Sequence, residues 1–431
     1  MKSPKSFFSK WLLCCLLMAL IATNAFAEKI LVWTWYESAL GQIFRDLIQN
    51  EFTPQTGIEV EILTVPIEDM TSKLLLAYLG GDAPDVVELY SNTAVELGVR
   101  GALLNLNDID GVQNVIADLN PMLLPALQYK SALFAVPGEV NWTWTYYRKD
   151  ILSEMGLGAP VTWDDFRDAS VKLKARDMDS YYYYQGDPSA LIVGKLLPFV
   201  YQRQSDIYTN DGEASNLDSP ENIAAFKELT DLYTKYKIPV EDPSFTTFAS
   251  GQTPLQILQN WYYGAFELAA PQIAGKWDIA LFPGTKQKDG SIDHTNTGKM
   301  LVWSIVSSTK KQEASWKLIE YLSSSEFTSK FMDLAYQSND KCRLFFSNKN
   351  SIDNALFPQE HIDLCRESLA KCRMQTAVIG GQVANRYIDF AFNKVILQNA
   401  DPEESIKQAA KESNLEIQKK LKEYSRFIKS L

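Results

Sequence analysis

The stretch from Phe134 to Asp150 combines side chains that are suited to binding polar, uncharged molecules. Glu139 and Asn141 alternate with apolar residues and Trp142 follows, all just after Pro137–Gly138. Carboxylates and amides hydrogen-bond to hydroxyl groups, and aromatic rings pack against apolar ring faces such as those of sugars. The alternation predicts a strand that lines a cleft, with the Pro–Gly pair as a pivot between two lobes. The alternative is a core strand that follows a turn.

Further candidates lie where strands of a parallel sheet are expected to end. The strand over residues 30–36 is followed by Glu37, and the strand over residues 85–90 is followed closely by Asn92. Ligands of open parallel sheets bind at the carboxyl ends of the strands. We therefore expect a binding site near residues 35–38 and 90–92.

Trp261 is the strongest single candidate for a stacking contact. It follows Asn260 after an apolar segment and precedes Gly264, which favours exposure to a cleft. A stacked ring contributes about 1–3 kcal/mol through buried apolar area. The alternative is a core tryptophan, which is the role that we assign to Trp144 and Trp303.

Motifs of the common enzyme classes are missing from the sequence. The chain has only two histidines, His294 and His361, and it contains neither a metal-ligand spacing, a Gly-x-Ser-x-Gly motif nor a phosphate-binding loop. Two carboxylates at a suitable separation could still form a secreted glycosidase. We expect a binding protein with no catalytic residues, no metal and no cofactor, and the alternative is a carbohydrate-active enzyme.

Residues 1–27 have the pattern of an export signal. Three lysines precede the apolar run Trp11–Ala22, and Ala25-Phe26-Ala27 forms a small-x-small cleavage site before Glu28. Cys14 and Cys15 raise the alternative of a lipoprotein. The residues before them are not the small ones that precede a lipidated cysteine, so we expect cleavage.

Composition limits what the exported chain can bind. Its net charge of −11 becomes −14 without the three leader lysines, which disfavours nucleic acid and anionic membranes as partners. The remaining length is sufficient for two domains. Of the three remaining cysteines, Cys342 could form one disulfide with either Cys365 or Cys372, and the sequence leaves the choice open.

The elements that must position these side chains alternate along the chain. Strand patterns at residues 30–36, 58–62 and 85–90 are separated by helical patterns, which predicts a largely parallel sheet and an α/β fold. Helix starts are indicated at Thr162–Asp165, Ser219–Pro220 and Asp401-Pro402. A strand is predicted over the four tyrosines at residues 181–184, another at residues 277–282 as the return between lobes, and the next at residues 300–306.

Several weak motifs occur together in one order. They are Gly81–Val87 (GDAPDVV), the Val136-Pro137 strand ending in YYRKD, Phe248–Gly251 (FASG), Trp277–Gly284 (WDIALFPG) and Lys310–Trp316 (KKQEASW). Over nearly all of the mature length, the chain resembles extracellular solute-binding proteins of the maltose-binding type, which serve ABC sugar importers. The resemblance implies a two-lobed periplasmic binding protein type II fold, with lobes of mainly parallel sheet flanked by helices.

The resemblance also implies a division of the chain and a mode of action. Residues 28–137 with 283–338 would form the first lobe, and residues 138–282 with 339–431 the second. The lobes would be joined near Pro137, near Pro283 and by a segment over residues 335–350. A periplasmic monomer would close over a neutral sugar or oligosaccharide and deliver it to an ABC permease. A ligand-presenting sensor on the same fold is an alternative.

Matching family positions imply a ligand shell. Its residues are Trp35, Tyr36, Glu37, Tyr90, Asn92, Glu139, Asn141, Trp142, Asp187 and Trp261. The chain departs from the family pattern before Trp261 and at Cys342–Phe346, where the pocket would be reshaped. This shell contains no lysine or arginine cluster, which argues against phosphorylated or acidic ligands.

Overall fold

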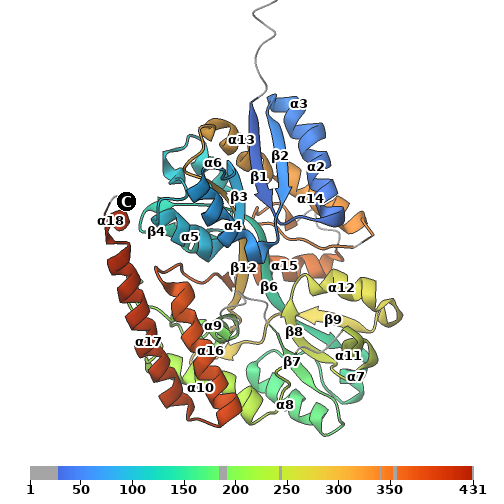
Figure 1. Ribbon diagram of the computed structural model, residues 1–431. Coiled ribbons are helices and arrows are strands. Elements are labelled where there is room, and N and C mark those ends of the chain that lie inside the picture. The colour runs from blue at the N-terminus through green and yellow to red at the C-terminus, as the bar shows by residue number, and fades with distance from the viewer. Residues whose placement is uncertain (1–27, 184–191, 242–244, 340, 353–356, 430–431) are drawn as a thin grey trace, which may run out of the picture.

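The computed structural model describes residues 28–183, 192–241, 245–339, 341–352 and 357–429. Two α/β lobes lie one above the other, and one sheet runs through both (Figure 1). Its strand order is β2-β1-β3-β12-β6-β8-β7, with β9 paired to β6 and β13 paired to β12. The leader and Cys14 and Cys15 lie outside the described residues.

The first lobe is built on the parallel strands β1 (Lys29–Thr34), β2 (Glu59–Thr64) and β3 (Val86–Tyr90). Val32 pairs with Ile62 on one side and with Val86 on the other. The helices of this lobe are α2 (Ser38–Leu47), α3 (Thr53–Thr56), α4 (Ile67–Gly80), α5 (Ser91–Val99), α6 (Val112–Ala117), α13 (Gln312–Ser323) and α14 (Ser325–Gln337), and a short hairpin joins β4 (Gln128–Tyr129) to β5 (Ala132–Leu133). This order of strands and helices confirms the predicted alternation at the start of the chain.

The second lobe contains β7 (Ser180–Tyr182), β8 (Leu255–Gln259) and β9 (Trp277–Ala280). Its helices are α7 (Lys149–Glu154), α8 (Trp163–Lys174), α9 (Ile192–Tyr201), α10 (Pro220–Thr234), α11 (Phe245–Ser250), α12 (Tyr262–Ala269), α15 (Gln359–Ala370), α16 (Gly381–Gln398), α17 (Pro402–Glu423) and α18 (Ser425–Ile428). The predicted helix starts are confirmed, because Thr162, Ser219 and Asp401 each cap a helix with a side-chain oxygen.

Two long strands join the lobes. β6 (Val136–Arg148) pairs with β12 (Asn296–Ile305) along its first half and with β8 and β9 along its second. β12 in turn pairs with β3, so it carries the chain back to the first lobe. Both strands are antiparallel to these neighbours, whereas β1, β2 and β3 pair in parallel.

The segment around Pro283, where the sequence predicts the second crossing, contacts the second lobe. β9 pairs only with β6 and ends at Ala280, so it is not a return strand. The next residues contact the second lobe: the Gln202 side-chain amide donates to Pro283 O at 3.0 Å and to Thr295 O at 2.9 Å. The β10 (Thr285–Lys286) and β11 (Ile292–Asp293) hairpin lies between those two contacts. We therefore propose that the lobe boundary lies within β12, because that strand makes the pairing with β3.

The third connection follows α14 and runs beside β6. Phe345 O accepts from Val140 N at 2.8 Å, and Ser347 N donates to Gly138 O at 3.0 Å. From there the chain enters α15 and β13 (Cys372–Arg373), which pairs with β12. The end of α17 then approaches the first lobe, where Tyr424 packs in one cluster with residues of α5. Figure 1 shows α17 along the edge of both lobes.

The disulfide that the sequence permits does not form. Cys342 is partly exposed, whereas Cys365 and Cys372 are buried. Burial raises the pKa of both buried thiols. Within the described ranges, none of the helices combines the length and apolarity that crossing a bilayer requires.

Candidate ligand-binding site

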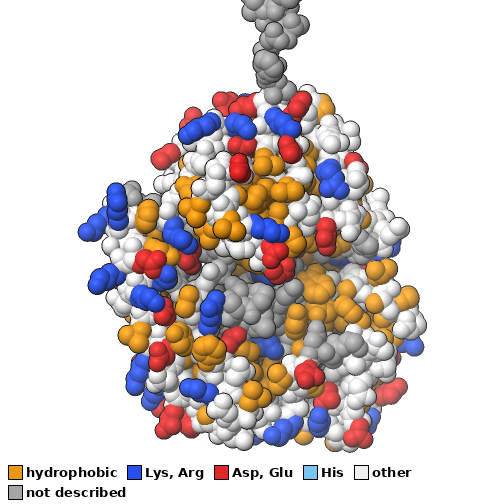
Figure 2. All heavy atoms as spheres, in the orientation of Figure 1, with side chains coloured by type: hydrophobic (Ala, Val, Ile, Leu, Met, Phe, Trp, Pro, Cys, Tyr) orange, Lys and Arg blue, Asp and Glu red, His pale blue; other side chains and the backbone are white. Residues whose placement is uncertain are grey.

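A cavity of about 440 Å³ lies where the two lobes meet beside β6 and β12. Figure 2 shows that the molecular surface is hollowed at the boundary between the lobes. The cavity is lined by Trp35, Glu37, Pro66, Ile67, Glu68, Tyr90, Glu139, Asn141, Gln259, Trp261, Lys299, Leu301, Cys342 and Leu344. Six sequence-predicted residues are thus brought together: Trp35, Glu37, Tyr90, Glu139, Asn141 and Trp261. That they contact a ligand stays a prediction.

Strand alternation decides which side chains of β6 reach the cavity. Glu139 and Asn141 lie on one face of the strand, and the Asn141 amide donates to Glu139 Oε1 at 2.9 Å. Trp142 lies on the opposite face and is fully buried. Its ring packs on Phe345 and Trp144, with centroid distances of 4.9 and 5.7 Å. The structure therefore corrects the assignment of Trp142, which is a core residue like Trp144.

The same correction applies after β1. Trp35 and Glu37 line the cavity, but Tyr36 between them turns into the first lobe and is 1% exposed. Its ring packs against Phe44 and Phe331, with centroid distances of 5.4 and 5.0 Å. Tyr36 therefore supports the wall of the cavity from behind and does not line it.

Trp261 connects β8 to α12 and contributes a ring from the second lobe. It is half-buried, and its ring stacks on Tyr262 with a centroid distance of 3.9 Å. The indole Nε1 donates to Gln259 Oε1 at 3.2 Å. These two contacts fix the ring before any ligand arrives, which lowers the entropic cost of a stacking contact.

Lys299 is a cavity residue that the sequence analysis missed. It pairs with Asn141 across β12 and β6 and lines the same cavity. Its Nζ donates to Tyr90 Oη at 2.7 Å and lies 3.9 Å from the centre of the Tyr90 ring. The described lining sets this one lysine against three glutamates, Glu37, Glu68 and Glu139. The charge of the cavity therefore still disfavours an anionic ligand.

Two carboxyl groups near the site are buried: Glu139 lines the cavity, and Glu88 lies outside the lining. Burial raises the pKa of Glu139 to about 7, opposed by the Asn141 hydrogen bond and the Lys299 charge. Burial also raises the pKa of Glu88, on β3, to about 8, opposed by a hydrogen bond of 2.6 Å from Thr34 Oγ1 and assisted by the charge of Glu139. Both groups are therefore partly protonated near neutral pH.

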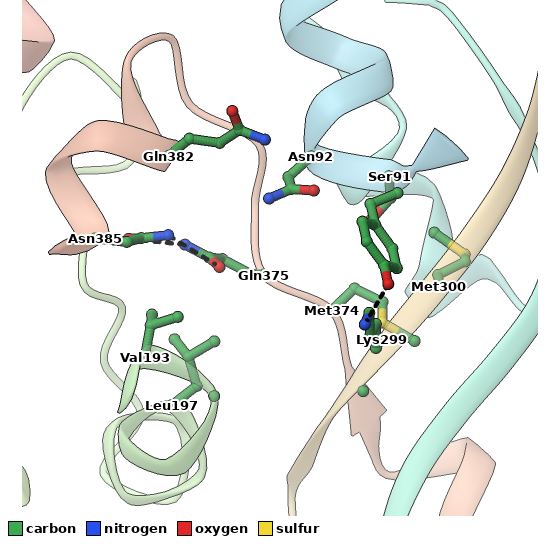
Figure 3. A pocket seen from close by; sticks show the side chains of 13 residues that line it. Ser91, Asn92, Val193, Leu197, Lys299, Met300, Met374, Gln375, Gln382 and Asn385 are labelled. Atoms are coloured by element: carbon green, nitrogen blue, oxygen red, sulfur yellow. Dashed lines mark hydrogen bonds between the residues drawn. The ribbon is translucent and has the colours of Figure 1, made fainter. Parts of the chain in front are cut away.

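Asn92 lines a smaller neighbouring cavity of about 60 Å³. Figure 3 shows Asn92 and Gln382 facing each other across it, with the linked pair Gln375 and Asn385 alongside. Tyr90 and Lys299 line both cavities and so lie between them. The structure thus places Asn92 next to the larger cavity and not in it.

The remaining predicted residue, Asp187, lies outside the described residues. Among the residues that the sequence analysis missed, Pro66–Glu68 follow the end of β2, so the rule for strand ends could have found them. Gln259 immediately precedes the Asn260-Trp261 pair that was selected. Leu301 carries no local signal, because only the pairing of β12 brings it to the cavity. Cys342 and Leu344 belong to the Cys342–Phe346 segment that was expected to reshape the pocket, and both line it.

Two curated relatives match most of the chain at low identity. A maltotriose-binding protein of Pyrococcus abyssi is 23% identical over 322 residues, which is 72% of this chain and 66% of that protein. A multiple sugar-binding protein of Streptococcus mutans is 23% identical over 309 residues, which is 64% of this chain and 67% of that protein. The matched part is thus about two thirds of each relative's length.

Solved structures confirm the expected fold. The sugar-binding protein MalE from Xanthomonas citri has a TM-score of 0.76 at 19% identity, covering 91% of this chain and 98% of that one. A cyclic α-maltosyl-1,6-maltose binding protein from Arthrobacter globiformis has a TM-score of 0.76 at 16% identity, covering 91% and 99%. The family model for bacterial extracellular solute-binding proteins matches residues 34–328, more than half of the chain, and the protein therefore belongs to this family.

Proposed function

We propose that the protein binds a neutral sugar or oligosaccharide outside the cytoplasm and delivers it to an ABC importer. The observation that carries this proposal is the 440 Å³ cavity, which receives Trp35 from the first lobe and Trp261 from the second. Its volume lies in the usual range for small-molecule sites. The names of the relatives support a carbohydrate as the ligand, and three glutamates against one lysine support an uncharged one.

The lining supplies both kinds of contact that a sugar needs. Indole faces bury the apolar C–H faces of the rings, and the polar lining offers hydrogen bonds to hydroxyl groups. A hydroxyl that lost its water without gaining such a bond would cost about 1–3 kcal/mol. Asn141 and Glu139 on β6 therefore fix the orientation of the sugar, while Trp35 and Trp261 hold its ring faces.

Closure follows from the position of the cavity between lobes. A ligand that contacts residues of both lobes binds the closed form more tightly and so shifts the population toward it. The pairing of β6 with β12 is the hinge about which the lobes turn. In this proposal the protein is an exported monomer, released from its leader at Glu28, and the closed faces of both lobes contact the permease.

Intrinsic tryptophan fluorescence tests the proposal. Tagatose, maltose, maltotriose and maltotetraose are titrated into the mature chain, with amino acids and polyamines as a second panel. We expect a saturable change with at least one sugar, and a much weaker change in Trp261→Ala. A response to amino acids or polyamines alone would overturn the substrate class. Sugar hydrolysis, followed in the same samples by chromatography, would favour the alternative of an enzyme.

A further inference from the structure

Glu139 has an unusual environment for a carboxylate in a binding cavity. It lines the cavity although only 5% of it is exposed. Oε1 accepts the hydrogen bond from Asn141, whereas Oε2 has no hydrogen-bond partner among the described residues. A buried carboxylate oxygen without a donor is unfavourable, so the group must gain either a proton or a new donor.

The groups around Glu139 do not remove this need. Lys299 on β12 is the basic side chain of the described lining, but its Nζ donates to Tyr90 Oη. Glu88 on β3 interacts with Glu139, but burial raises the pKa of Glu88 to about 8, so this neighbour is mostly protonated at neutral pH and donates no hydrogen bond to Glu139. Further titratable groups come from other elements: Glu37, Glu68 and Cys342 line the same cavity. Tyr36, after β1, interacts with both buried carboxyls.

We propose that the Glu139 carboxyl group turns when a sugar binds, so that the buried Oε2 reaches the cavity and accepts a hydrogen bond from a sugar hydroxyl, and that Glu139 then loses its own proton to solvent. This inference rests on the proposed function and adds its regulation by pH. The sugar keeps its hydroxyl proton and forms one O–H···O hydrogen bond. The carboxyl proton leaves to water, and Lys299 remains as the nearby positive charge. Glu139 thereby selects ligands with a donor at this position.

The sign of the pH dependence follows from these charges. With its pKa raised to about 7, Glu139 is a mixture of both forms in the free protein at neutral pH. A donated hydrogen bond favours the ionised form, so the bound state has the lower pKa. Binding is therefore tighter above pH 7 and weakens as the pH falls below it. Between pH 8 and pH 6 the affinity should fall by about five- to tenfold.

Isothermal titration calorimetry tests this inference directly. The panel sugar with the largest fluorescence change is titrated at pH 6, 7 and 8, and at pH 7 in two buffers with different ionisation enthalpies. We expect the loss of affinity at pH 6 and the release of up to about half a proton per sugar at pH 7. Glu139→Gln should remove both effects, because a carboxamide does not titrate.

Glu88→Gln is the matched control, because Glu88 is a buried carboxyl on the neighbouring β3 that does not line the cavity. It should keep the pH dependence of binding. If the pH dependence of binding were lost in Glu88→Gln but kept in Glu139→Gln, Glu88 and not Glu139 would be its source. That result would overturn the inference. Equal affinity at pH 6 and 8 in the wild type, without proton release, would overturn it whether or not the variants fold. In that case sugar binding, and with it the proposed function, would still stand, whereas no binding at any pH would overturn both.

Discussion

Trp142 and Trp261 both follow an asparagine in the sequence, yet they have different surroundings. Trp142 lies inside a long paired strand, where its parity turns it away from the cavity that Asn141 lines. Trp261 follows the end of a strand and precedes α12, so strand parity does not determine its direction. At the scale of single residues, an aromatic residue in a strand can therefore be predicted to contact a ligand only when it is known which face of the strand it lies on.

Alanine substitutions separate the roles of these two tryptophans. Trp261→Ala should lower sugar affinity by about 10- to 100-fold, because it removes a stacking face worth about 1–3 kcal/mol, and should change stability little. Trp142→Ala should instead lower the free energy of unfolding by about 3–5 kcal/mol, because it leaves a void in the core. Calorimetry measures the first effect and urea unfolding the second. If Trp142→Ala and Trp261→Ala lowered the free energy of unfolding equally, the assignment of one tryptophan to the core and the other to the ligand would be wrong.

Glu88 makes stability depend on pH in a direction opposite to that of most carboxylates. Its pKa is about 8 in the folded protein and about 4.5 when unfolded, so the folded state holds the extra proton between these values. The resulting stability is fully present below about pH 4.5 and is lost as the pH rises through 8.

The wild type should therefore lose on the order of 1–3 kcal/mol of unfolding free energy between pH 5 and pH 8 through Glu88. Glu88→Gln should not show this loss, because a carboxamide does not titrate. Urea unfolding of wild type and variant at both pH values measures the difference. Glu59→Gln, at an exposed position on β2, is the control and should leave the pH profile unchanged. A parallel profile for wild type and Glu88→Gln would show that Glu88 does not carry the extra proton.

At the scale of elements, periodicity and capping residues predicted much of the chain. The alternation of β2 and the caps of α8, α10 and α17 depend only on residues that are close in sequence. The structure confirms all four. The sequence prediction puts the second crossing near Pro283, whereas we propose that it lies in β12, because both the Trp277–Ala280 and Asn296–Ile305 strands contain apolar residues that fit a crossing. The two strands differ in their partners, since β12 pairs with β3 and β9 pairs with β6. Such pairing joins residues that are far apart in the sequence, so a local sequence pattern does not predict it.

At Gly298, β12 passes close to its neighbours. A Cβ there would lie 2.5 Å from Asn141 O and 2.7 Å from Cys372 Sγ. At Gly138 the nearest contact would be 3.0 Å, to the Trp303 indole nitrogen. Gly298→Ala should therefore cost about 1–3 kcal/mol of unfolding free energy, and more than Gly138→Ala.

Thermal unfolding of the two glycine variants, followed by circular dichroism, compares them. Sugar affinity should fall only in Gly298→Ala, because displacement of β12 also moves Lys299 relative to Asn141. A Gly138→Ala variant that is the less stable of the two would show that the hinge is tightest at the Pro–Gly pair.

The cavity is a property of the whole molecule. Its lining comes from strand ends, both crossing strands and the third connection, which are separated by up to about three hundred residues in the sequence. Strand ends could be selected from the sequence because each follows an apolar run. Lys299 could not, because it becomes a neighbour of Asn141 only when β12 pairs with β6.

Closure over a sugar should protect both lobes together. In hydrogen exchange with mass spectrometry, a saturating panel sugar should slow exchange at the start of α4 in the first lobe and at residues 259–263 in the second. At a hundredfold excess over the dissociation constant, the stabilisation is about 2.7 kcal/mol, or up to about a hundredfold slowing for amides that exchange by opening of the closed form. Helix α10, whose residues do not line the cavity, should change least. Protection confined to one lobe would mean that the sugar binds without closing the hinge, because only a ligand held by both lobes can slow exchange in both.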